Sequence, residues 1–130
     1  MERLAGVVIV NGSPNAASRL NGLVNHVQRR LALGGHAVEE IRVAELPAED
    51  LVFGRSDHPD IREAVGRVER AKAVVFASPV YKASYTGLLK LFLDVLPQRI
   101  LDDKWVAPVF IGGTIPHLLS VEFAFKPVAA

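Results

Sequence analysis

The sequence predicts an α/β fold built on a doubly wound parallel sheet, and two observations support this prediction. Four short apolar runs alternate along the chain with segments of helical periodicity, and such an alternation forms a parallel sheet with right-handed crossovers and helices on both faces. Of the G-x-G-x-x-G pattern that a dinucleotide-binding Rossmann domain carries after its first strand, only Gly12 is present. The flavodoxin-like strand order 2-1-3-4 is therefore favoured, with a ligand site between the first and third strands.

The composition is that of one domain with a core and without a strongly charged surface. The chain has 130 residues, of which 50% are hydrophobic, so we expect residues 1–130 to form a single domain. Its 15 basic and 14 acidic residues give a formal charge of +1, which argues against nucleic-acid binding and against a strongly acidic electron carrier. The chain has no cysteine, which excludes disulfides and thiolate chemistry, assigns any redox chemistry to a bound cofactor, and fits a reducing cytoplasm. The apolar segment near the N-terminus is too short for a signal peptide or a membrane span, so we expect a cytoplasmic protein without membrane contact.

The first part of the chain contains two predicted strands with a helix between them. Leu4 to Val10 is an apolar run that turn-forming residues interrupt at Asn11 to Asn15, which predicts the first strand and its loop. A helix follows, with Ser18 or Asn15 as its cap and a pair of glycines as its end. Its apolar residues with helical spacing are Leu20, Leu23, Val24, Val27 and Leu31. Apolar and charged residues are interleaved within His36 to Leu46, which predicts an edge strand with one face in water.

The next segment is predicted to be a loop followed by a short helix. Leu46 to Pro59 is polar and is interrupted by prolines and a glycine, so we expect a long loop that acts as a mobile flap and carries no catalytic group. Ile61, Val65 and Val68 have the spacing of an amphipathic helix, with Pro59 in its first turn.

A third strand and an apolar helix form the centre of the predicted site. Ala73 to Ala77 is an unbroken apolar run, which is typical of a strand covered on both faces, although a buried helix has the same pattern. Pro79 should end this strand, because proline cannot donate to a ladder. Thr86 is predicted to cap a helix that runs through the apolar residues Leu88 to Leu96, with Gly87 allowing close approach of the chain.

Two further elements are predicted towards the C-terminus. Trp105 to Ile111 reads as a fourth strand, and Pro108 within it indicates an edge strand or a local irregularity. Pro116 to Phe125 begins with a proline and is apolar on most sides, which predicts a last helix.

The first loop has the residues of an anion site. Ser13, Asn15, Ser18 and Arg19 lie at the start of the first helix, where free N–H groups and the positive end of the helix dipole attract a phosphate. Ordinary turn and cap residues would give the same pattern. A nucleoside triphosphate is disfavoured, because the loop is not a glycine-rich P-loop.

The third loop should lie beside the first, because the first and third strands are neighbours in this strand order. Pro79 to Lys82 could line the edge of a flat ring with backbone atoms. The alternative is a tight turn with Tyr81 as a surface aromatic residue. The two loops together favour a ligand site more strongly than either loop alone.

These loops carry motifs that resemble the NAD(P)H-dependent FMN reductases. The motifs are Gly12-Ser13 with Ser18-Arg19, then Pro79-x-Tyr81-x-x-Ser84-x-x-Gly87-x-Leu89-Lys90, then Gly112-Gly113-Thr114. The chain is most similar to the sulfonate-utilisation branch, in which the runs corresponding to Pro79 to Pro97 and Gly112 to Pro127 look almost the same. The resemblance covers nearly the whole chain.

The resemblance implies hydride transfer from NADPH or NADH to the N5 atom of FMN, and supply of reduced FMN to a partner flavin-dependent monooxygenase. It places the FMN phosphate in the first loop and the isoalloxazine ring against the third loop. No G-x-S-x-G or H-E-x-x-H motif is present, so we nominate no side-chain catalyst and no metal ligand. The cofactor-binding candidates are Ser13, Asn15, Ser18, Arg19, Leu20, Pro79, Val80, Tyr81, Lys82, Ser84, Gly112, Gly113 and Thr114.

Two features differ from the family pattern. Family members continue through a fifth strand and a final helix, whereas this chain ends just after Pro127, so we expect a shortened domain whose fourth strand has an uncovered edge. The wider family also has Asn where Lys82 stands, although the sulfonate-utilisation branch resembles this chain there.

Two alternative functions remain open. A flavoprotein on the same scaffold could retain FMN and reduce quinones, azo dyes or metal oxyanions. A non-enzymatic flavodoxin-like carrier is disfavoured by the formal charge of +1.

Three other features have a structural and a functional interpretation. His117 could contact the flavin or the nicotinamide, although a structural role is the simpler interpretation. Lys90 and Asp94 lie one helical turn apart, which predicts an exposed ion pair or, in an otherwise apolar helix, a contact with a subunit partner. The helix from Leu88 to Leu96 and the last helix are apolar on more faces than one sheet can cover, which predicts self-association as a dimer or a tetramer.

Overall fold

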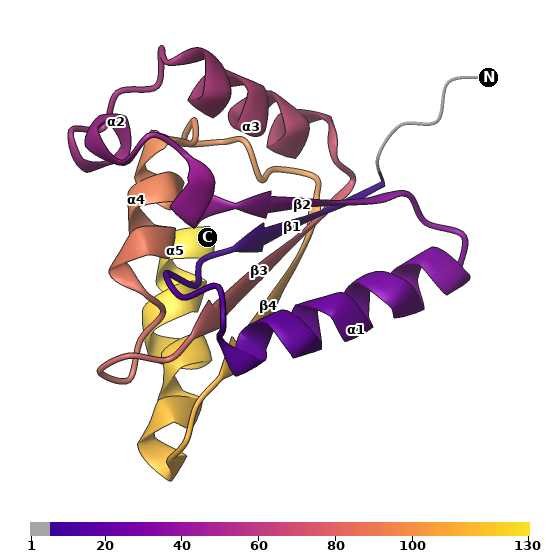
Figure 1. Cartoon of the computed structure of the whole chain (residues 1–130), viewed down its shortest axis with the longest axis vertical. Helices are drawn as coiled ribbons and strands as arrows, with labels where there is room; N and C mark the ends of the chain where they lie inside the picture. The colour runs from indigo at the N-terminus through magenta and orange to yellow at the C-terminus, as the bar shows by residue number, and fades with distance from the viewer. Residues whose placement is uncertain (1–5) are drawn as a thin grey trace.

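The computed structural model describes residues 6–130 and contains a four-stranded parallel sheet in the order β2-β1-β3-β4 (Figure 1). The strands are β1 (Val7–Asn11), β2 (Val38–Arg42), β3 (Ala73–Pro79) and β4 (Trp105–Ile111). The predicted flavodoxin-like fold and its strand order are confirmed, and β2 lies at an edge as its interleaved charges indicated. Of the predicted first strand, Leu4 and Ala5 lie outside the described residues.

Helices cover both faces of the sheet, so the two central strands are buried on both sides. On one face, α1 (Arg19–Leu33) packs Leu20 and Val24 against Val7 and Ile9. The other face carries α2 (Ala48–Val52), α3 (Pro59–Arg70) and α4 (Gly87–Val95), together with the C-terminal segment (Figure 1). Val8 and Val10 point to that face, because successive side chains of a strand alternate between its two sides.

The segment predicted as a long flap is in part a helix. Residues 48–52 form α2, and Leu51 lies buried in the core between the sheet and the helices. Glu49 and Asp50 occupy the first turn of α2, where carboxylates interact favourably with the helix dipole. The remaining loop is therefore short, and the expectation of a mobile flap from Leu46 to Pro59 is wrong for this part.

Each of the two prolines in the sheet turns its nitrogen to a side on which no strand residue pairs with it. β3 continues two residues beyond the predicted end at Ala77 and includes Pro79. The N–H of Ala73 points towards β1 and donates to Gly6, the residue before that strand. The N–H of Val80 points the other way and donates to Ile111 of β4. The nitrogen of Pro79 therefore faces the side of β1, which has already ended at Asn11.

Pro108 follows the same rule on the other side of the sheet. Trp105 donates its N–H towards β3, to the carbonyl of Lys72, so the alternation of the strand turns the nitrogen of Pro108 away from β3. Among residues 6–130 no strand pairs with this outer edge of β4. The prediction that Pro108 marks an edge strand is confirmed.

The last predicted helix is helical but irregular. A 3₁₀ turn at Ile115–Leu118 is followed by a π-helical segment at Ser120–Phe125 and by α5 at Lys126–Ala129. Pro127 lacks the N–H that a regular α-helix would donate to the carbonyl four residues earlier, and a wider turn precedes it. Phe125 anchors the segment, because its ring packs 5.5 Å from that of Phe76 and 5.4 Å from that of Phe110.

Candidate functional site

Three loops meet at the carboxyl ends of the strands, as the strand order requires. They are the first loop (residues 12–18, after β1), the third loop (residues 80–86, after β3) and the fourth loop (residues 112–114, after β4) (Figure 1). Gly12 donates its N–H to the carbonyl of Ala77 at 2.8 Å, and Val80 donates to Ile111 at 2.9 Å. Every loop in which the sequence placed cofactor-binding candidates thus lies at one edge of the sheet.

Thr86 connects the first loop to the third. Its hydroxyl donates to the carbonyl of Gly12 at 2.6 Å and accepts from the N–H of Leu89 at 3.1 Å, which makes Thr86 the N-cap of α4 as predicted. Its own N–H donates to the hydroxyl of Ser78 at 3.0 Å. Thr86 is 2% exposed, so all three bonds are shielded from water.

The bond from Thr86 takes the place of a missing ladder bond. Ala73 donates its N–H to the carbonyl of Gly6. Six residues further along both segments, the same pairing would place the N–H of residue 79 opposite the carbonyl of Gly12. Pro79 has no N–H. The hydroxyl of Thr86 supplies the donor instead, and this pairing lies between residues that are far apart in the sequence.

The close approach predicted at Gly87 occurs at Gly12. A Cβ atom on Gly12 would lie 2.7 Å from the Cβ atom of Leu89, whereas a Cβ atom on Gly87 would meet nothing within 4 Å. The prediction for Gly87 is therefore wrong. Gly12 lets the first loop pass directly over the start of α4.

The first loop is closed by its own side chains. The hydroxyl of Ser13 donates to the carbonyl of Asn15 and accepts from its N–H. The side-chain oxygen of Asn15 accepts from Ala17 at 2.9 Å. Ser18, rather than Asn15, caps α1 by accepting from Leu20 at 3.1 Å.

The chemistry of this loop fits a phosphate. Two hydroxyls, an amide and the exposed side chain of Arg19 surround the start of α1, and the first turn of α1 contains no acidic residue. A cavity of about 100 Å³ beside the loop is lined in part by Ser13, Asn15 and Arg42. Leu20 differs from the other candidates, because its side chain is fully buried in the core under α1 and its N–H donates to Ser18.

The third loop folds as a two-residue hairpin turn. Tyr81 and Ser84 exchange both backbone hydrogen bonds, at 2.9 and 3.1 Å. Lys82 and Ala83 between them have φ angles of 54° and 60°, the left-handed geometry of a type I′ turn, which Asn and Gly adopt most readily. The Asn of the wider family at the position of Lys82 suits this geometry better than Lys does. Val80 is buried and Tyr81 is half exposed at this edge.

The fourth loop is shaped by His117. The N–H of Gly113 donates to Nδ1 of His117 at 3.1 Å, and a Cβ atom on Gly112 would lie 2.6 Å from the Cβ atom of His117. Gly112, Gly113 and Thr114 are all exposed. His117 thus has a structural role, as an acceptor that holds the glycine pair open to solvent.

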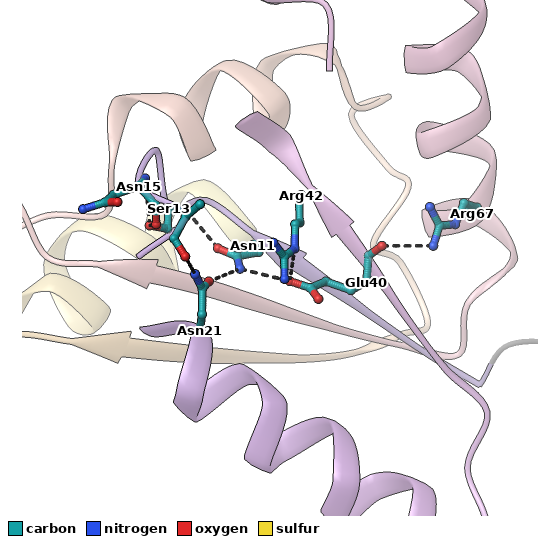
Figure 2. Close-up of polar contacts among 8 residues, drawn as sticks. Asn11, Ser13, Asn15, Asn21, Glu40, Arg42 and Arg67 are labelled. Carbon is teal, nitrogen blue, oxygen red and sulfur yellow. Dashed lines mark hydrogen bonds and ion pairs between the residues drawn. The ribbon is translucent and has the colours of Figure 1, made fainter. Parts of the chain in front are cut away.

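A buried polar cluster beneath the first loop was missed by reasoning from the sequence. Asn11, at the end of β1, contacts Ser13, Asn21 of α1 and Glu40 of β2 (Figure 2). The sequence pattern presents Asn11 as a turn residue and Glu40 as one of the interleaved charges of an edge strand. The available signal was that the side chain at the last residue of a buried central strand is itself buried.

The titratable groups near the loops supply no evident acid or base. Burial raises the pKa of the Tyr85 hydroxyl above its usual value, so this group stays protonated at neutral pH. The predicted pair of Lys90 and Asp94 is confirmed at 2.8 Å, and the hydrogen bond that Lys90 donates to Asp94 raises the pKa of Lys90. Within residues 6–130 no group of three His, Asp or Glu side chains could hold a metal ion.

A larger groove lies away from these loops. Its volume is about 440 Å³, and it is bounded by the C-terminal end of α4 and by α5. The carboxyl edge of the sheet faces the other end of α4, where Thr86 caps the helix. The groove is therefore separate from the candidate site.

Comparison with known proteins identifies relatives along nearly the whole chain. Residues 5–130 match the model of the NADPH-dependent FMN reductase family. An FMN reductase (NADPH) of Pseudomonas putida is 41% identical over 94% of this chain and 62% of its own length. An FMN reductase (NADPH) of Escherichia coli is 38% identical over 94% of this chain and 64% of its own length.

Among solved structures, an NADH:FMN oxidoreductase in its apo form superposes with a TM-score of 0.87 at 35% identity, over 95% of this chain and 66% of that one. The chain thus spans less than two thirds of the length of these two curated relatives.

The replacement of the ladder donor by Thr86 predicts a large effect of removing its hydroxyl. Thr86→Val leaves the carbonyl of Gly12 and the N–H of Leu89 without partners, and we expect it to lower the free energy of unfolding by about 2–4 kcal/mol in urea denaturation. Thr86→Ser retains the hydroxyl and should lose less than about 1 kcal/mol. In the Thr86→Val background, Pro79→Ala restores an N–H opposite Gly12 and should recover part of the loss. Equal stability of Thr86→Val and the wild type would contradict this account.

The left-handed turn at Lys82 and Ala83 predicts a stabilising substitution. Ala83→Gly removes a Cβ atom from a left-handed residue, and we expect it to raise the free energy of unfolding by about 1 kcal/mol. Ala32→Gly is the matched control, because Ala32 is exposed in regular helix α1, where glycine should destabilise by about 0.5–1 kcal/mol. Thermal unfolding that shifts in the same direction for both variants would refute the argument from backbone strain.

Proposed function

We propose, from the premise that this chain belongs to the NADPH-dependent FMN reductase family, that it oxidises reduced nicotinamide and reduces FMN at the carboxyl edge of its sheet. The observation that carries this proposal is the junction at Thr86, which brings the first loop against the start of α4 and the third loop. The loop proposed to bind phosphate and the loop proposed to support a flat ring are thereby held next to each other, which supports a ligand with both groups, such as FMN.

The chain's own residues would bind and orient the two substrates. Ser13, Asn15, Ser18 and Arg19 would hold the phosphate, because hydroxyl, amide and guanidinium donors surround the start of α1. Pro79 to Ser84, with Gly112 to Thr114 beside them, would support the ring through backbone atoms held in place by the β3–β4 ladder. FMN, when bound, would supply the hydride acceptor at N5. We assign no side chain as an acid or base, and the role of the protein is to position the ring and to exclude water from it.

The partner and the location of the protein are further parts of the proposal. The likeness of Pro79 to Pro97 to the sulfonate-utilisation reductases supports the transfer of reduced FMN to a flavin-dependent monooxygenase. The lack of cysteine supports a reducing cytoplasm. Across residues 6–130, none of the helices has both the length and the apolar character that crossing a membrane would require.

Steady-state oxidation of NADPH, followed with and without added FMN, tests the reaction. We expect oxidation that depends on free FMN and saturates with it, because the flavin is proposed as a substrate. NADH, assayed in parallel, reports which nicotinamide is preferred. Oxidation by a protein that retains its flavin, unaffected by free FMN but accelerated by a quinone, would indicate a reductase that retains FMN. Protein that is colourless, binds no FMN and oxidises neither nicotinamide would refute the proposal.

We also propose that the chain self-associates. The described part of the C-terminal segment leaves four apolar side chains largely exposed, which are Ile115, Leu118, Leu119 and Phe123. By contrast, Leu89, Phe92 and Val95 of α4 are buried in the hydrophobic core of the chain. We therefore propose that the subunit contact is centred on the C-terminal segment rather than on residues Leu88 to Leu96. Exposed apolar patches of this kind mark interfaces.

Size-exclusion chromatography with light scattering measures this association directly. We expect a dimer or a tetramer at micromolar concentration, and a smaller species for Phe123→Glu, because Phe123 is 75% exposed and a carboxylate there would disfavour burial. Phe53→Glu is the control, since Phe53 is similarly exposed beside α2. A monomeric wild type would rule out self-association.

A further inference from the structure

We propose that Glu40 of the edge strand β2 is a positioning residue that sets the shape of the first loop through Asn11 and Asn21 (Figure 2). The proposal rests on the proposed function, because the first loop is where the phosphate of FMN would bind. It assigns a role in flavin selectivity to a carboxylate that does not itself lie in the loop.

Asn11 is the centre of the cluster. It is 3% exposed, and its side-chain amide makes three hydrogen bonds. Nδ2 donates to Oδ1 of Asn21 and to Oε2 of Glu40, both at 3.0 Å, and Oδ1 accepts from the N–H of Ser13 at 2.9 Å. An ionised carboxylate can only accept hydrogen bonds, so Glu40 fixes which side of the amide faces β2. The oxygen of Asn11 is thereby directed at Ser13.

Asn21 carries the same constraint to the other side of the loop. Because its oxygen accepts from Asn11, its amide nitrogen must face away, and it donates to the carbonyl of Ala16. The cluster therefore holds the first loop at two points, Ser13 and Ala16. Both contacts depend on how the two amides are oriented, and the acceptor at Glu40 determines that orientation. An acceptor on β2 thus determines the orientation of two amides in series.

Glu40 is itself held in place by two arginines. Its Oε2 lies 3.4 Å from Nε of Arg42, and its backbone carbonyl accepts from Nη2 of Arg67 at 3.2 Å. The side chain of Glu40 is 14% exposed, so it is largely shielded from water and from screening by salt. Its position is therefore set before any ligand binds.

A phosphate would be sensitive to this arrangement, whereas a flavin without a phosphate would not. The cluster positions the backbone at Ser13, whose N–H donates to Asn11, and the backbone at Ala16, and both residues lie in the loop proposed to bind phosphate. Riboflavin has the ring of FMN but no phosphate, so it would contact the third loop and its affinity would not depend on the shape of the first loop. The ratio of the affinities for FMN and riboflavin therefore isolates the effect of the cluster.

The experiment measures both affinities by flavin fluorescence titration for the full chain and for three variants. Glu40→Leu removes the acceptor, and we expect FMN affinity to fall about tenfold, the value of one charge-assisted hydrogen bond, with riboflavin affinity unchanged. Glu40→Gln retains an oxygen but not the charge or the fixed direction, and should reduce the ratio less. Glu39→Gln is the matched control, because Glu39 is adjacent on β2 and pairs with Arg67 at 2.9 Å without contacting Asn11. Its ratio should equal that of the wild type.

The outcomes separate this inference from the proposed function. A Glu40→Leu ratio equal to that of the wild type would overturn the positioning role even if the enzyme oxidises NADPH with FMN. A ratio that falls in all three variants alike would overturn it as well, since Glu39 does not reach the loop. If Glu40→Leu does not fold by circular dichroism, the ratio for Glu40→Gln decides, and no decrease would refute the role. A wild type that prefers FMN but oxidises no nicotinamide would contradict the proposed function and leave the positioning role intact.

Discussion

The hydrogen bond from the hydroxyl of Thr86 to the carbonyl of Gly12 is the constraint on which the arrangement of the site depends. Pro79 has no N–H to donate towards β1. Without Thr86 the carbonyl of Gly12 would therefore be buried without a hydrogen-bond partner, at a cost of about 1–3 kcal/mol. The same hydroxyl caps α4. One side chain therefore completes the sheet, starts a helix and joins two loops, and a glycine is needed at residue 12 because Leu89 packs against it.

The third loop shows how a rigid frame maintains an unfavourable backbone conformation. Lys82 and Ala83 both adopt left-handed angles, which other residues than Gly and Asn adopt at a cost of about 1–2 kcal/mol each. The flanking residues are fixed on both sides, since Val80 is bonded to Ile111 and Thr86 to Ser78. The turn is thus over-determined by its neighbours, and its backbone can be presented to a ligand without rearranging on binding.

Sequence reasoning located the elements whose signal is local. Apolar runs and helical spacing predicted all four strands, α1, α3 and α4, and proline at the start of α3 and within β4 was interpreted correctly. The candidate loops came together because parallel strands present their carboxyl ends at one edge. Three features depended on distant partners and were not predictable in this way: the continuation of β3 through Pro79, the burial of Leu51 in α2, and the bonding of Glu40 to Asn11. From the sequence, a charged residue on an edge strand is expected to face solvent, because its hydrogen-bond partner on a neighbouring strand cannot be identified.

The cluster beneath the first loop keeps its one carboxylate away from the proposed phosphate. A carboxylate at residue 11 would hold the loop through the same N–H of Ser13, but it would bring a negative charge directly beneath the proposed phosphate and beside Glu40. Asn11 and Asn21 are neutral amides, so they transmit direction without charge. The only carboxylate in the cluster lies one residue further away, on β2, and Arg42 compensates it. The two neutral amides thus connect Glu40 to the loop without placing a carboxylate directly beneath the proposed phosphate.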